Sequence, residues 1–379
     1  MQYRPIGKTG MSASVIGLGA EHLDNKPYET VDTVVNAALD HGINIMDLFM
    51  PGEPVRTNIG RALGGRRDKM LIQGHIGSTD INEQYDKSRD LPIVKKYFEN
   101  LLRCLNTDYI DIGMLFYIDK EKDFTDVFEG ESLRYAQELK QQGRIRAIGF
   151  SSHDPVIARR VVETGVVDLL MFSINPAFDM ASAETYVLDY MEALDFEKKL
   201  NRDRAALYQL CEQRGVAITV MKTLGAGKLL SPEHTPFAKP MTVAQCIHYA
   251  LTRPAVVSAL IGCRSEEEVR EAVAYLEKSD AERDYSAVLQ DFQGDFKGRC
   301  VYCNHCLPCP SEINIADVHK YLDIAVLDEA RVPPSIVSHY RSLNRHASDC
   351  SACGSCEERC PFSVPIIKNM KKAVALLEK

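Results

Sequence analysis

Residues 300–310 read Cys-Val-Tyr-Cys-Asn-His-Cys-Leu-Pro-Cys-Pro, and residues 350–361 read Cys-Ser-Ala-Cys-Gly-Ser-Cys-Glu-Glu-Arg-Cys-Pro. The second run has the spacing C-x2-C-x2-C-x3-C-P, which is used to hold a cubane 4Fe–4S cluster. In proteins with two clusters, the cysteine before the proline ligates the other cluster. The pattern therefore predicts two clusters with crossed ligands. One would use Cys300, Cys303, Cys306 and Cys360, and the other Cys350, Cys353, Cys356 and Cys309.

Zinc and disulfides compete with this interpretation. The first run has two residues instead of three before its last cysteine, which leaves its crossed ligation open. Structural zinc also uses C-x2-C pairs, but two four-cysteine runs that both end in Cys-Pro favour iron–sulfur. Disulfides are typical of small secreted chains, whereas this chain has 379 residues and 12 cysteines. The four cysteines outside the runs are expected to be buried thiols: Cys104, Cys211, Cys246 and Cys263.

The composition limits the partners and the compartment. Apolar residues make up 45% of the chain and charged residues 26%, as in ordinary soluble proteins. A formal net charge of -8 argues against nucleic acid as a partner, because no basic surplus is available to neutralise phosphates. The start of the chain has no apolar core of signal-peptide length, and no run reaches the length of a membrane span. We therefore expect a cytoplasmic protein that does not bind a membrane.

Before the cysteine runs, strand-like and helix-like segments alternate regularly. A hairpin is expected over Tyr3–Ser14, followed by strands at Val15–Leu18, Ile43–Leu48, Met70–Gly77, Tyr109–Ile118, Ile145–Ser151, Asp168–Asn175, Val216–Leu224 and Val256–Ile261. Apolar strands that are joined by crossover helices pair in parallel, with both faces covered. Eight such units favour a closed (β/α)8 TIM barrel of the α/β class over an open sheet. No Gly-x-Gly-x-x-Gly follows the first strand, so the main indication of a doubly wound dinucleotide fold is missing.

We expect this barrel over residues 1–285 and a mostly α-helical iron–sulfur domain over residues 286–379. The bridge Ile313–Arg345 has a helical pattern that is interrupted at Pro333, and it resembles the α-helical ferredoxin modules of fumarate-reductase-type proteins. One long loop, Pro176–Arg202, follows a barrel strand. Such insertions often shape substrate entry, and a surface helix without a role fits the segment equally well.

Reacting groups in a TIM barrel lie at the C-terminal ends of its strands. The residues expected there are Asp47, His75, Tyr117, Asp119, Ser151, Ser152, His153, Asn175, Lys222, Gly262, Arg264 and Ser265. His75 beside Asp47 would make an acid–base pair, since imidazole titrates near neutral pH and a carboxylate would fix its tautomer. His153 and Tyr117 are candidates for a second proton donor. Either histidine could instead be a hydrogen-bonded structural residue.

Several segments resemble the aldo-keto reductase family. Arg4–Gly19, which reads RPIGKTGMSASVIGLG, is similar to the opening of that family. Later blocks of the family are similar to Tyr109–Ile112 (YIDI), Ile145–His153 (IRAIGFSSH) and Val220–Leu229 (VMKTLGAGKL). The resemblance covers residues 1 to about 280, and the cysteine-rich end is similar to the branch of the family that ends in a ferredoxin-like module.

The resemblance also shows which catalytic residues are replaced. The family uses an Asp, Tyr, Lys and His tetrad, of which only Asp47 is matched here. Phe49–Glu53 occupies a shortened loop where the tyrosine is expected, His75 replaces the lysine, and Phe116 replaces the histidine. The tyrosine donates a proton as hydride arrives, and its neighbours tune its pKa. Ordinary NADPH-dependent carbonyl reduction would therefore lack its proton source.

Several of the cofactor-binding residues that the resemblance implies are also replaced. Ser152 stands where the family has an Asn that holds the nicotinamide amide, Ser173 replaces a Gln, and Ala272 replaces an Asn. Gly262–Ser265, at the start of the last barrel helix, still suits a phosphate through the helix N-terminus and Arg264. The candidate cofactor-binding residues are Ser151, Ser152, Asn175, Lys222, Gly262, Arg264 and Ser265. NADP(H) is a possible ligand, and the question of a flavin stays open.

Three functional hypotheses follow. The first is an iron–sulfur oxidoreductase whose two clusters relay electrons to or from a barrel site, with Asp47, His75, His153 and Tyr117 as catalytic residues. The second is an NAD(P)H-dependent carbonyl or alcohol oxidoreductase, and the third is an inactive barrel that serves as an electron-transfer scaffold. The expected partners are a small-molecule substrate and a redox partner protein. We expect an anaerobic host, because exposed low-potential clusters are sensitive to oxygen.

Overall fold

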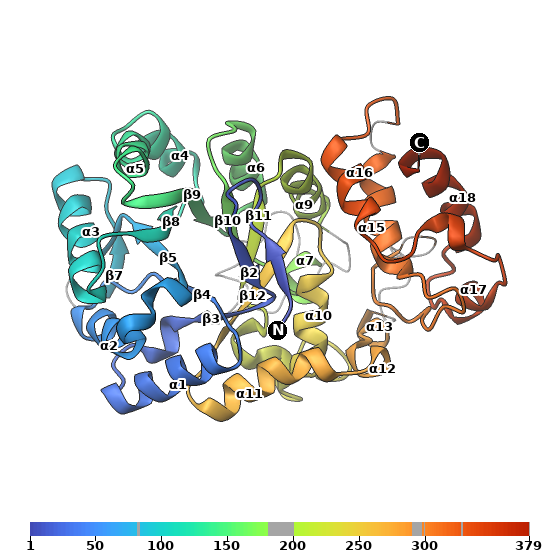
Figure 1. The fold of residues 1–379 in the computed structure, drawn as a ribbon, viewed down its shortest axis with the longest axis horizontal. Helices are drawn as coiled ribbons and strands as arrows, with labels where there is room; N and C mark the ends of the chain where they lie inside the picture. The colour runs from blue at the N-terminus through green and yellow to red at the C-terminus, as the bar shows by residue number, and fades with distance from the viewer. Residues whose placement is uncertain (82–83, 181–200, 290–297, 299, 327–328, 379) are drawn as a thin grey trace. The chain divides into compact units, whose positions relative to one another are not determined.

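Eight parallel strands close into a barrel, in the order β10-β11-β12-β3-β4-β5-β8-β9. Their bounds are β3 Ile16–Gly19, β4 Ile45–Leu48, β5 Leu71–Ile76, β8 Ile110–Leu115, β9 Ile145–Ser152, β10 Leu169–Ser173, β11 Ala217–Met221 and β12 Val256–Gly262. Each predicted strand contains or overlaps one of these, so the (β/α)8 TIM barrel is confirmed. Figure 1 shows the elements in chain order.

The structure is a computed structural model, and it describes residues 1–81, 84–180, 201–289, 298, 300–326 and 329–378. The chain forms two compact units. The first consists of Met1–Ile174, Val216–Thr223 and Val257–Leu276, and the second of Asn175–Gly215, Leu224–Val256 and Glu277–Lys379. Most of the long loop that the sequence indicates after β10, residues 181–200, lies outside the described residues. The domain boundary at residues 285 and 286 stays a prediction.

The helices of the first unit are amphipathic. They are α1 Tyr28–Asp40, α2 Glu53–Leu63, α3 Leu91–Leu105, α4 Glu121–Phe128, α5 Ser132–Gln141, α6 Pro155–Glu163 and α11 Glu266–Ala274. In α3, Val94, Phe98 and Leu101 recur at helical spacing and are buried. The helix begins at Asp90, whose side chain accepts a hydrogen bond from the Ile93 N–H, and it ends at the left-handed Asn106.

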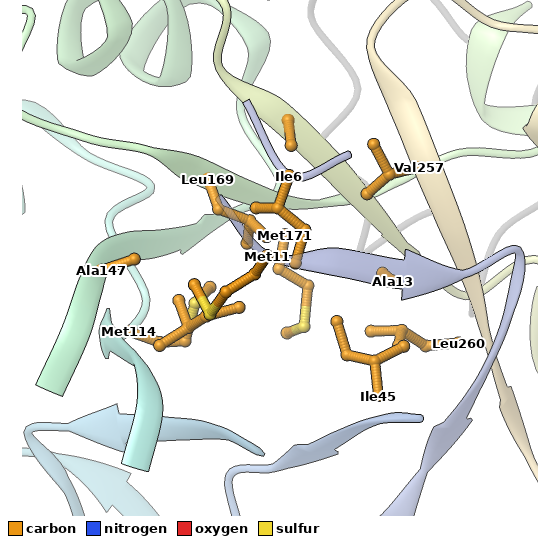
Figure 2. Packing of buried hydrophobic residues seen from close by; sticks show 12 residues of the cluster. Ile6, Met11, Ala13, Ile45, Met114, Ala147, Leu169, Met171, Val257 and Leu260 are labelled. Atoms are coloured by element: carbon orange, nitrogen blue, oxygen red, sulfur yellow. The ribbon is translucent and has the colours of Figure 1, made fainter. Parts of the chain in front are cut away.

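The N-terminal hairpin covers one end of the barrel. Strands β1 Tyr3–Pro5 and β2 Ser12–Ser14 pair antiparallel, as the sequence predicts. Ile6, Met11 and Ala13 join a buried apolar cluster with residues near the starts of the barrel strands, among them Ile45 and Leu169 (Figure 2). This packing fills the N-terminal end of the barrel, so polar groups gather at the C-terminal ends of the strands.

The structure adds elements of the first unit for which the sequence analysis gives no bounds, among them α4 and the two that follow. One is a second antiparallel hairpin, β6 Ser78–Ile81 with β7 Gln84–Lys87. The other is α2, which contains Gly60 in its interior. A Cβ at Gly60 would lie 2.5 Å from the carbonyl oxygen of Cys104, so glycine is required where α2 approaches the end of α3.

The second unit is mainly helical. Its helices are α7 Pro176–Asp179, α9 Arg202–Arg214, α10 Val243–Leu251, α12 Asp280–Arg283, α13 Ser286–Leu289, α15 Ile315–Ala325, α16 Pro334–Arg341, α17 Ser355–Arg359 and α18 Ile366–Leu377. Helices α15 and α16 confirm the predicted helical bridge between the cysteine runs. Among the described residues, no helix is both long and apolar enough to cross a membrane.

A buried polar centre joins α7, α9 and α10 within this unit. Asp179 forms an ion pair with Arg204 Nε at 2.8 Å, and it accepts hydrogen bonds from the hydroxyls of Tyr208 at 2.6 Å and Tyr249 at 2.8 Å. All four side chains are buried. Because each polar group has a partner, the centre fixes the three helices together without leaving an unpaired charge.

Candidate active site and candidate metal centres

The first polar group inside the barrel joins β4 and β5. His75 Nε2 lies 2.8 Å from Asp47 Oδ1, and Gln73 Nε2 donates to the same oxygen at 3.1 Å. Gln73 and His75 are two residues apart on β5, so both side chains point into the barrel. The structure thus forms the acid–base pair that the sequence indicates, and the catalytic role of Asp47 and His75 stays a prediction.

Aromatic rings enclose this pair. The His75 ring contacts Phe116 edge-on, with 5.2 Å between centroids, and Phe49 at 6.1 Å. Phe49 also contacts Tyr85, from the β6–β7 hairpin, at 5.2 Å. The His75 side chain is 0% exposed, and within the described part of the chain its Nδ1 has no hydrogen-bond partner. A substrate could therefore reach His75 only after one of these rings moves.

The second polar group connects three strand ends in a chain of hydrogen bonds. Asp119, after β8, accepts from His153 twice: the backbone N–H lies 2.6 Å from Oδ1, and Nδ1 lies 2.9 Å from Oδ2. His153 Nε2 lies 2.8 Å from Lys222 Nζ, which follows β11. Since Asp119 fixes the proton on Nδ1, Nε2 is the nitrogen that accepts from the lysine.

Lys222 and Tyr117 are held in a strained backbone conformation. Their φ angles are 59° and 56°, in the left-handed region that bulky residues rarely adopt. Such strain occurs where surrounding contacts enforce it, and it is frequent at functional sites. Both residues are partly exposed, and the Tyr117 ring lies 5.3 Å from the His153 ring.

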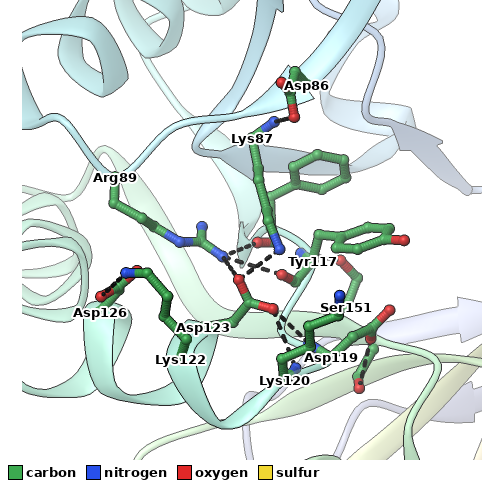
Figure 3. A network of polar contacts seen from close by, with 12 residues as sticks. Asp86, Lys87, Arg89, Tyr117, Asp119, Lys120, Lys122, Asp123, Asp126 and Ser151 are labelled. Carbon is green, nitrogen blue, oxygen red and sulfur yellow. Dashed lines mark hydrogen bonds and ion pairs between the residues drawn. The ribbon is translucent and has the colours of Figure 1, made fainter.

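A polar network fixes the segment after β8 that carries Tyr117 and Asp119 (Figure 3). Arg89 donates to the Tyr117 carbonyl at 3.0 Å, and Ser151 Oγ accepts from the Tyr117 N–H at 2.9 Å. Asp123, near the start of α4, accepts from Lys87 Nζ at 2.5 Å and from the Asp119 N–H at 3.3 Å. These contacts position the Asp119 carboxylate before any ligand arrives.

The environment of Lys222 lowers the pKa of its amine. Burial lowers the pKa of Lys222 to about 8, against the opposing effects of Glu21 and Asp119. An amine with this pKa is mostly protonated at pH 7, and it can exchange its proton near neutral pH. The sequence indicates Lys222 only as a cofactor contact, whereas the structure places it at the end of an Asp–His–Lys chain.

The other predicted cofactor residues fall into three places, the third of which lies between β12 and α11. Near the Asp–His–Lys chain, the Ser152 hydroxyl donates to Asp119 Oδ1 at 3.1 Å. In the second unit, Asn175 caps α7 by accepting from the Phe178 N–H at 2.9 Å. These side chains therefore already serve the protein's own contacts.

The predicted phosphate position lies between β12 and α11. Ser265 caps α11, but the first turn of this helix carries Glu266, Glu267 and Glu268. Glu268 Oε2 accepts from the Arg264 N–H at 2.6 Å, which occupies one of the backbone donors that a phosphate would use. Gly262 packs against the His22 ring. A Cβ at this position would lie 2.6 Å from the imidazole, so only glycine fits there.

The cysteine runs interleave around two cavities in the second unit. The first cavity has a volume of about 320 Å³, including solvent at its mouth, and its lining includes Cys300, Cys303, Cys306 and Cys360. The second has a volume of about 350 Å³ by the same measure, and its lining includes Cys309, Cys350, Cys353 and Cys356. We call these the first and second cysteine sets. In each set, the cysteine before the proline comes from the opposite run, as the spacing predicts.

Four cysteines line each cavity, which is the number of thiolates that a 4Fe–4S cluster uses. Among the described residues, no three His, Cys, Asp or Glu side chains are placed to hold a single metal ion. Paired zinc would require sulfurs that converge on one point, at about 2.3 Å from the metal. Burial raises the pKa of Cys303 and of Cys306 to about 12, so iron would have to displace protons on binding. The remaining cysteines, Cys104, Cys211, Cys246 and Cys263, are buried thiols as predicted.

Two partners in the barrel site were not assigned a role by the sequence pattern. Asp119 orients His153, and Gln73 supports Asp47. The sequence places Asp119 at a strand end, two residues after Tyr117, but it does not show that this carboxylate bonds to His153. Gln73 lies inside a strand, where a buried glutamine gives no signal of such a contact.

This fold and these sites define a class, namely a barrel oxidoreductase that carries an iron–sulfur domain. More particularly, the chain belongs to the aldo/keto reductase family, whose pattern matches residues 15–245. A second pattern, that of a 4Fe-4S dicluster domain, matches residues 299–365 and includes all eight cysteines of the two sets.

Relatives extend the match over most of the barrel. The uncharacterized oxidoreductase YqkF of Bacillus subtilis (strain 168) is 25% identical over 289 residues, which cover 72% of this chain and 90% of the relative. The L-galactose dehydrogenase of Arabidopsis thaliana is 26% identical over 306 residues, which cover 72% and 88%. The holo form of aldo-keto reductase AKR11C1 from Bacillus halodurans shares the fold, with a TM-score of 0.59 and 21% identity over 77% of this chain and 96% of that one.

Proposed function

We propose that the protein is an iron–sulfur oxidoreductase in which Lys222, His153 and Asp119 move the proton that accompanies reduction or oxidation of a small molecule at the barrel strand ends. The hydrogen-bonded chain of these three residues carries the proposal. It provides an acid in a barrel whose family tyrosine is replaced. The strained backbone at Tyr117 and Lys222 favours a working site over an inactive scaffold.

Each residue has a distinct role in the proton transfer. In the reducing direction, the Lys222 ammonium donates a proton to the substrate oxygen that gains negative charge. After this transfer, His153 Nε2 takes up a proton from solvent and passes it to the neutral amine, and Asp119 stabilises the intervening imidazolium. Tyr117, beside His153, would orient the substrate. In the oxidising direction, the neutral amine takes the proton from an alcohol.

Asp47 and His75 enter this proposal as a second, enclosed acid–base pair. Their contact links β4 and β5, and Gln73 continues it toward Met171 in the apolar core. Because aromatic rings cover His75, we assign this pair to the support of the site. Direct proton transfer from His75 would require displacement of Phe49 or Phe116.

We further propose that each cysteine set holds one 4Fe–4S cluster, with crossed ligands. The two four-thiol cavities support this assignment, because Cys360 lines the first and Cys309 lines the second. When bound, such clusters supply single electrons at potentials that the surrounding charge and hydrogen bonds set.

Iron analysis of anaerobically reconstituted protein tests the cluster assignment. We expect about eight iron and eight acid-labile sulfide per chain. Cys360→Ala should disturb the first cluster and Cys309→Ala the second, while Cys263→Ala, a buried thiol outside both sets, should leave both unchanged. If Cys360→Ala and Cys350→Ala disturb the same cluster and leave the other intact, the crossed scheme is wrong. Stoichiometric zinc without a visible chromophore would end the iron–sulfur assignment.

A nicotinamide cofactor is the second candidate for the electron source. The family match and the Arg264–Ser265 helix start favour it, whereas three glutamates in the first turn of α11 oppose a 2′-phosphate. We therefore expect weaker binding of NADPH than of NADH. Titration of the purified protein with both nucleotides measures this difference. Tight, selective NADPH binding would show that the glutamates do not govern this position.

A further inference from the structure

A buried arginine contacts the backbone of the first cysteine set. Arg253 follows α10 and is 8% exposed. Its Nη2 donates to the carbonyl oxygen of Val301 at 2.6 Å and lies 2.9 Å from the Tyr285 hydroxyl. The Tyr285 hydroxyl donates to the same carbonyl at 2.8 Å. Since Val301 is the neighbour of Cys300, these bonds hold the guanidinium against the first set.

The charge of Arg253 has no anionic partner within hydrogen-bond range among the described residues. Its Nη2 contacts only neutral oxygens, and its Nε has no partner. Asp179 is already paired with Arg204, and Asp323 accepts a hydrogen bond from the Tyr302 hydroxyl at 2.6 Å. A buried cation without a compensating anion is strongly unfavourable. Four thiolates around the adjacent cavity would supply that negative charge.

A second arginine approaches the same set from α17. Arg359 donates to the Cys306 carbonyl from Nε at 3.2 Å and from Nη2 at 2.7 Å, and to the Pro308 carbonyl at 2.7 Å. Its hydrogen bonds join the two runs, because Arg359 directly precedes Cys360 in the sequence. The first set therefore has a cation bonded to its backbone at two places, of which only that of Arg253 is not shared with the second set.

The second set differs in exposure and in charge. Cys353 is exposed, whereas Cys303 and Cys306 of the first set are buried. In the described part of the chain, no buried arginine donates to the backbone of the second set; the partly exposed Arg359 donates to the carbonyl of Pro308, the neighbour of Cys309. The other polar contacts of the second set are with neutral groups, such as the Ala352 N–H, 3.4 Å from Cys350 Sγ, and the Ser355 hydroxyl, 3.7 Å from Cys353 Sγ.

We propose that Arg253 raises the reduction potential of the first-set cluster above that of the second-set cluster, so that an electron accepted at the exposed second set moves on to the first. This inference rests on the proposed function, because it requires both clusters. One cluster loses an electron and the other gains it, with no proton transferred. Reduction adds negative charge, which a nearby cation stabilises. Burial of the first set opposes this effect, but burial also leaves the arginine charge less screened.

Redox titration of the reconstituted protein, followed by electron paramagnetic resonance, tests the proposal. Wild type should show two reduction steps. Arg253→Met should shift only the step at higher potential, by at least a tenfold fall in its equilibrium constant, or about 59 mV for one electron. Arg253→Lys, which keeps the charge, should recover more than half of the shift. Arg345→Met is the matched control, because it removes a positive charge that pairs with the exposed Glu312, and it should shift neither step.

Asp323→Asn gives an independent test if Arg253→Met takes up too little iron. Removal of this carboxylate should raise the same step, which is the opposite direction. The proposal is wrong if Arg253→Met binds about eight iron and its higher step stays within twofold of wild type, or if Asp323→Asn leaves that step unmoved. Wild-type protein with far fewer than eight iron would overturn the proposed function instead.

The metal-free protein provides a second readout. Without a cluster, Arg253 is a buried cation that hydrogen-bonds only to neutral oxygens, and Asp179 acts on it only from beyond hydrogen-bond range, so Arg253→Met should make the metal-free form at least as heat-stable as wild type. In the loaded form, the same variant should unfold at a lower temperature than wild type. Destabilisation of both forms by the same amount would assign Arg253 a packing role and would overturn the electrostatic proposal.

Discussion

The barrel contains two hydrogen-bonded Asp–His pairs, which differ in what the second ring nitrogen of each histidine contacts. In one, His75 Nε2 lies 2.8 Å from Asp47; in the other, His153 Nδ1 lies 2.9 Å from Asp119. The remaining nitrogen of His75 meets no hydrogen-bond partner in the described structure and is enclosed by aromatic rings. The remaining nitrogen of His153 continues to Lys222, which is partly exposed.

The difference shows that a short Asp–His distance does not by itself identify a proton-transfer site. A general acid also needs a path to the substrate and a pKa near the working pH. Only the Asp119 pair ends in a group with both properties, because Lys222 is partly exposed and has a pKa of about 8. The enclosed pair instead resembles the polar networks that make a core specific.

The largest expected effect is the loss of the lysine. Lys222→Met should slow turnover by about 10² to 10⁴-fold, because it removes the positioned acid, while both clusters and the fold are kept. Lys222→Arg keeps the charge but cannot release a proton near neutral pH, so it should be almost as slow. The measurement is steady-state reduction of a panel of small aldehydes with a one-electron dye or a nicotinamide as donor. Wild-type rates in Lys222→Met would remove the lysine from the mechanism.

The two histidines provide the direct comparison. His153→Gln should slow turnover by about 10²-fold, since the lysine loses its proton relay, whereas His75→Gln should slow it by less than about tenfold. Both variants remove one imidazole beside a buried carboxylate, so each serves as the control for the other. A greater loss in His75→Gln would show that the aromatic rings open during turnover and that the sequence-based assignment of His75 as a catalytic residue is right.

The pH dependence should follow the lysine. In the reducing direction the protonated amine is required, so the rate should be nearly constant below pH 7 and should fall about tenfold between pH 7 and pH 9. In the oxidising direction the neutral amine is required, and the rate should rise over the same range. Rate–pH profiles in both directions check the sign. A decrease in both directions would point to loss of structure at high pH.

The smallest effect concerns the stability of the enclosed pair. His75→Leu leaves Asp47 with Gln73 as its hydrogen-bond partner, and it should reduce the free energy of unfolding by about 1–3 kcal/mol. Chemical denaturation of the metal-free protein measures this loss. The double variant with Asp47→Leu should recover part of it, because the buried carboxylate is then also removed. An unchanged midpoint in His75→Leu would mean that the pair contributes nothing to the stability of the barrel.

Local patterns in the sequence were sufficient to predict the barrel strands and the cysteine sets. Apolar runs separated by helical segments specify parallel strands, and the spacing of the cysteines specifies which thiols share a cavity. The bounds of helix α2 were not predicted; Gly60 lowers its helical propensity, although close packing against the end of α3 requires that glycine.

The barrel site was harder to predict than the fold. His153 and Lys222 are 69 residues apart in sequence, and only closure of the barrel brings them together. The burial of His75 depends on Phe49, Phe116 and a hairpin with weak sequence signals. Strand-end positions identified which residues face the site, but not which of them are connected or covered.

The interleaving of the cysteine sets restricts the order in which the second unit can mature. Cys309 emerges from the ribosome with the first run, yet it lines the second cavity, and Cys360 is the last cysteine of the chain but lines the first. The second cavity therefore has its four thiols only after translation has passed residue 356, and the first only after it has passed residue 360. Iron delivery is consequently a late event that follows synthesis of the entire barrel. A ribosome that stalls between residues 310 and 350 would leave a nascent chain without a complete site for either cluster.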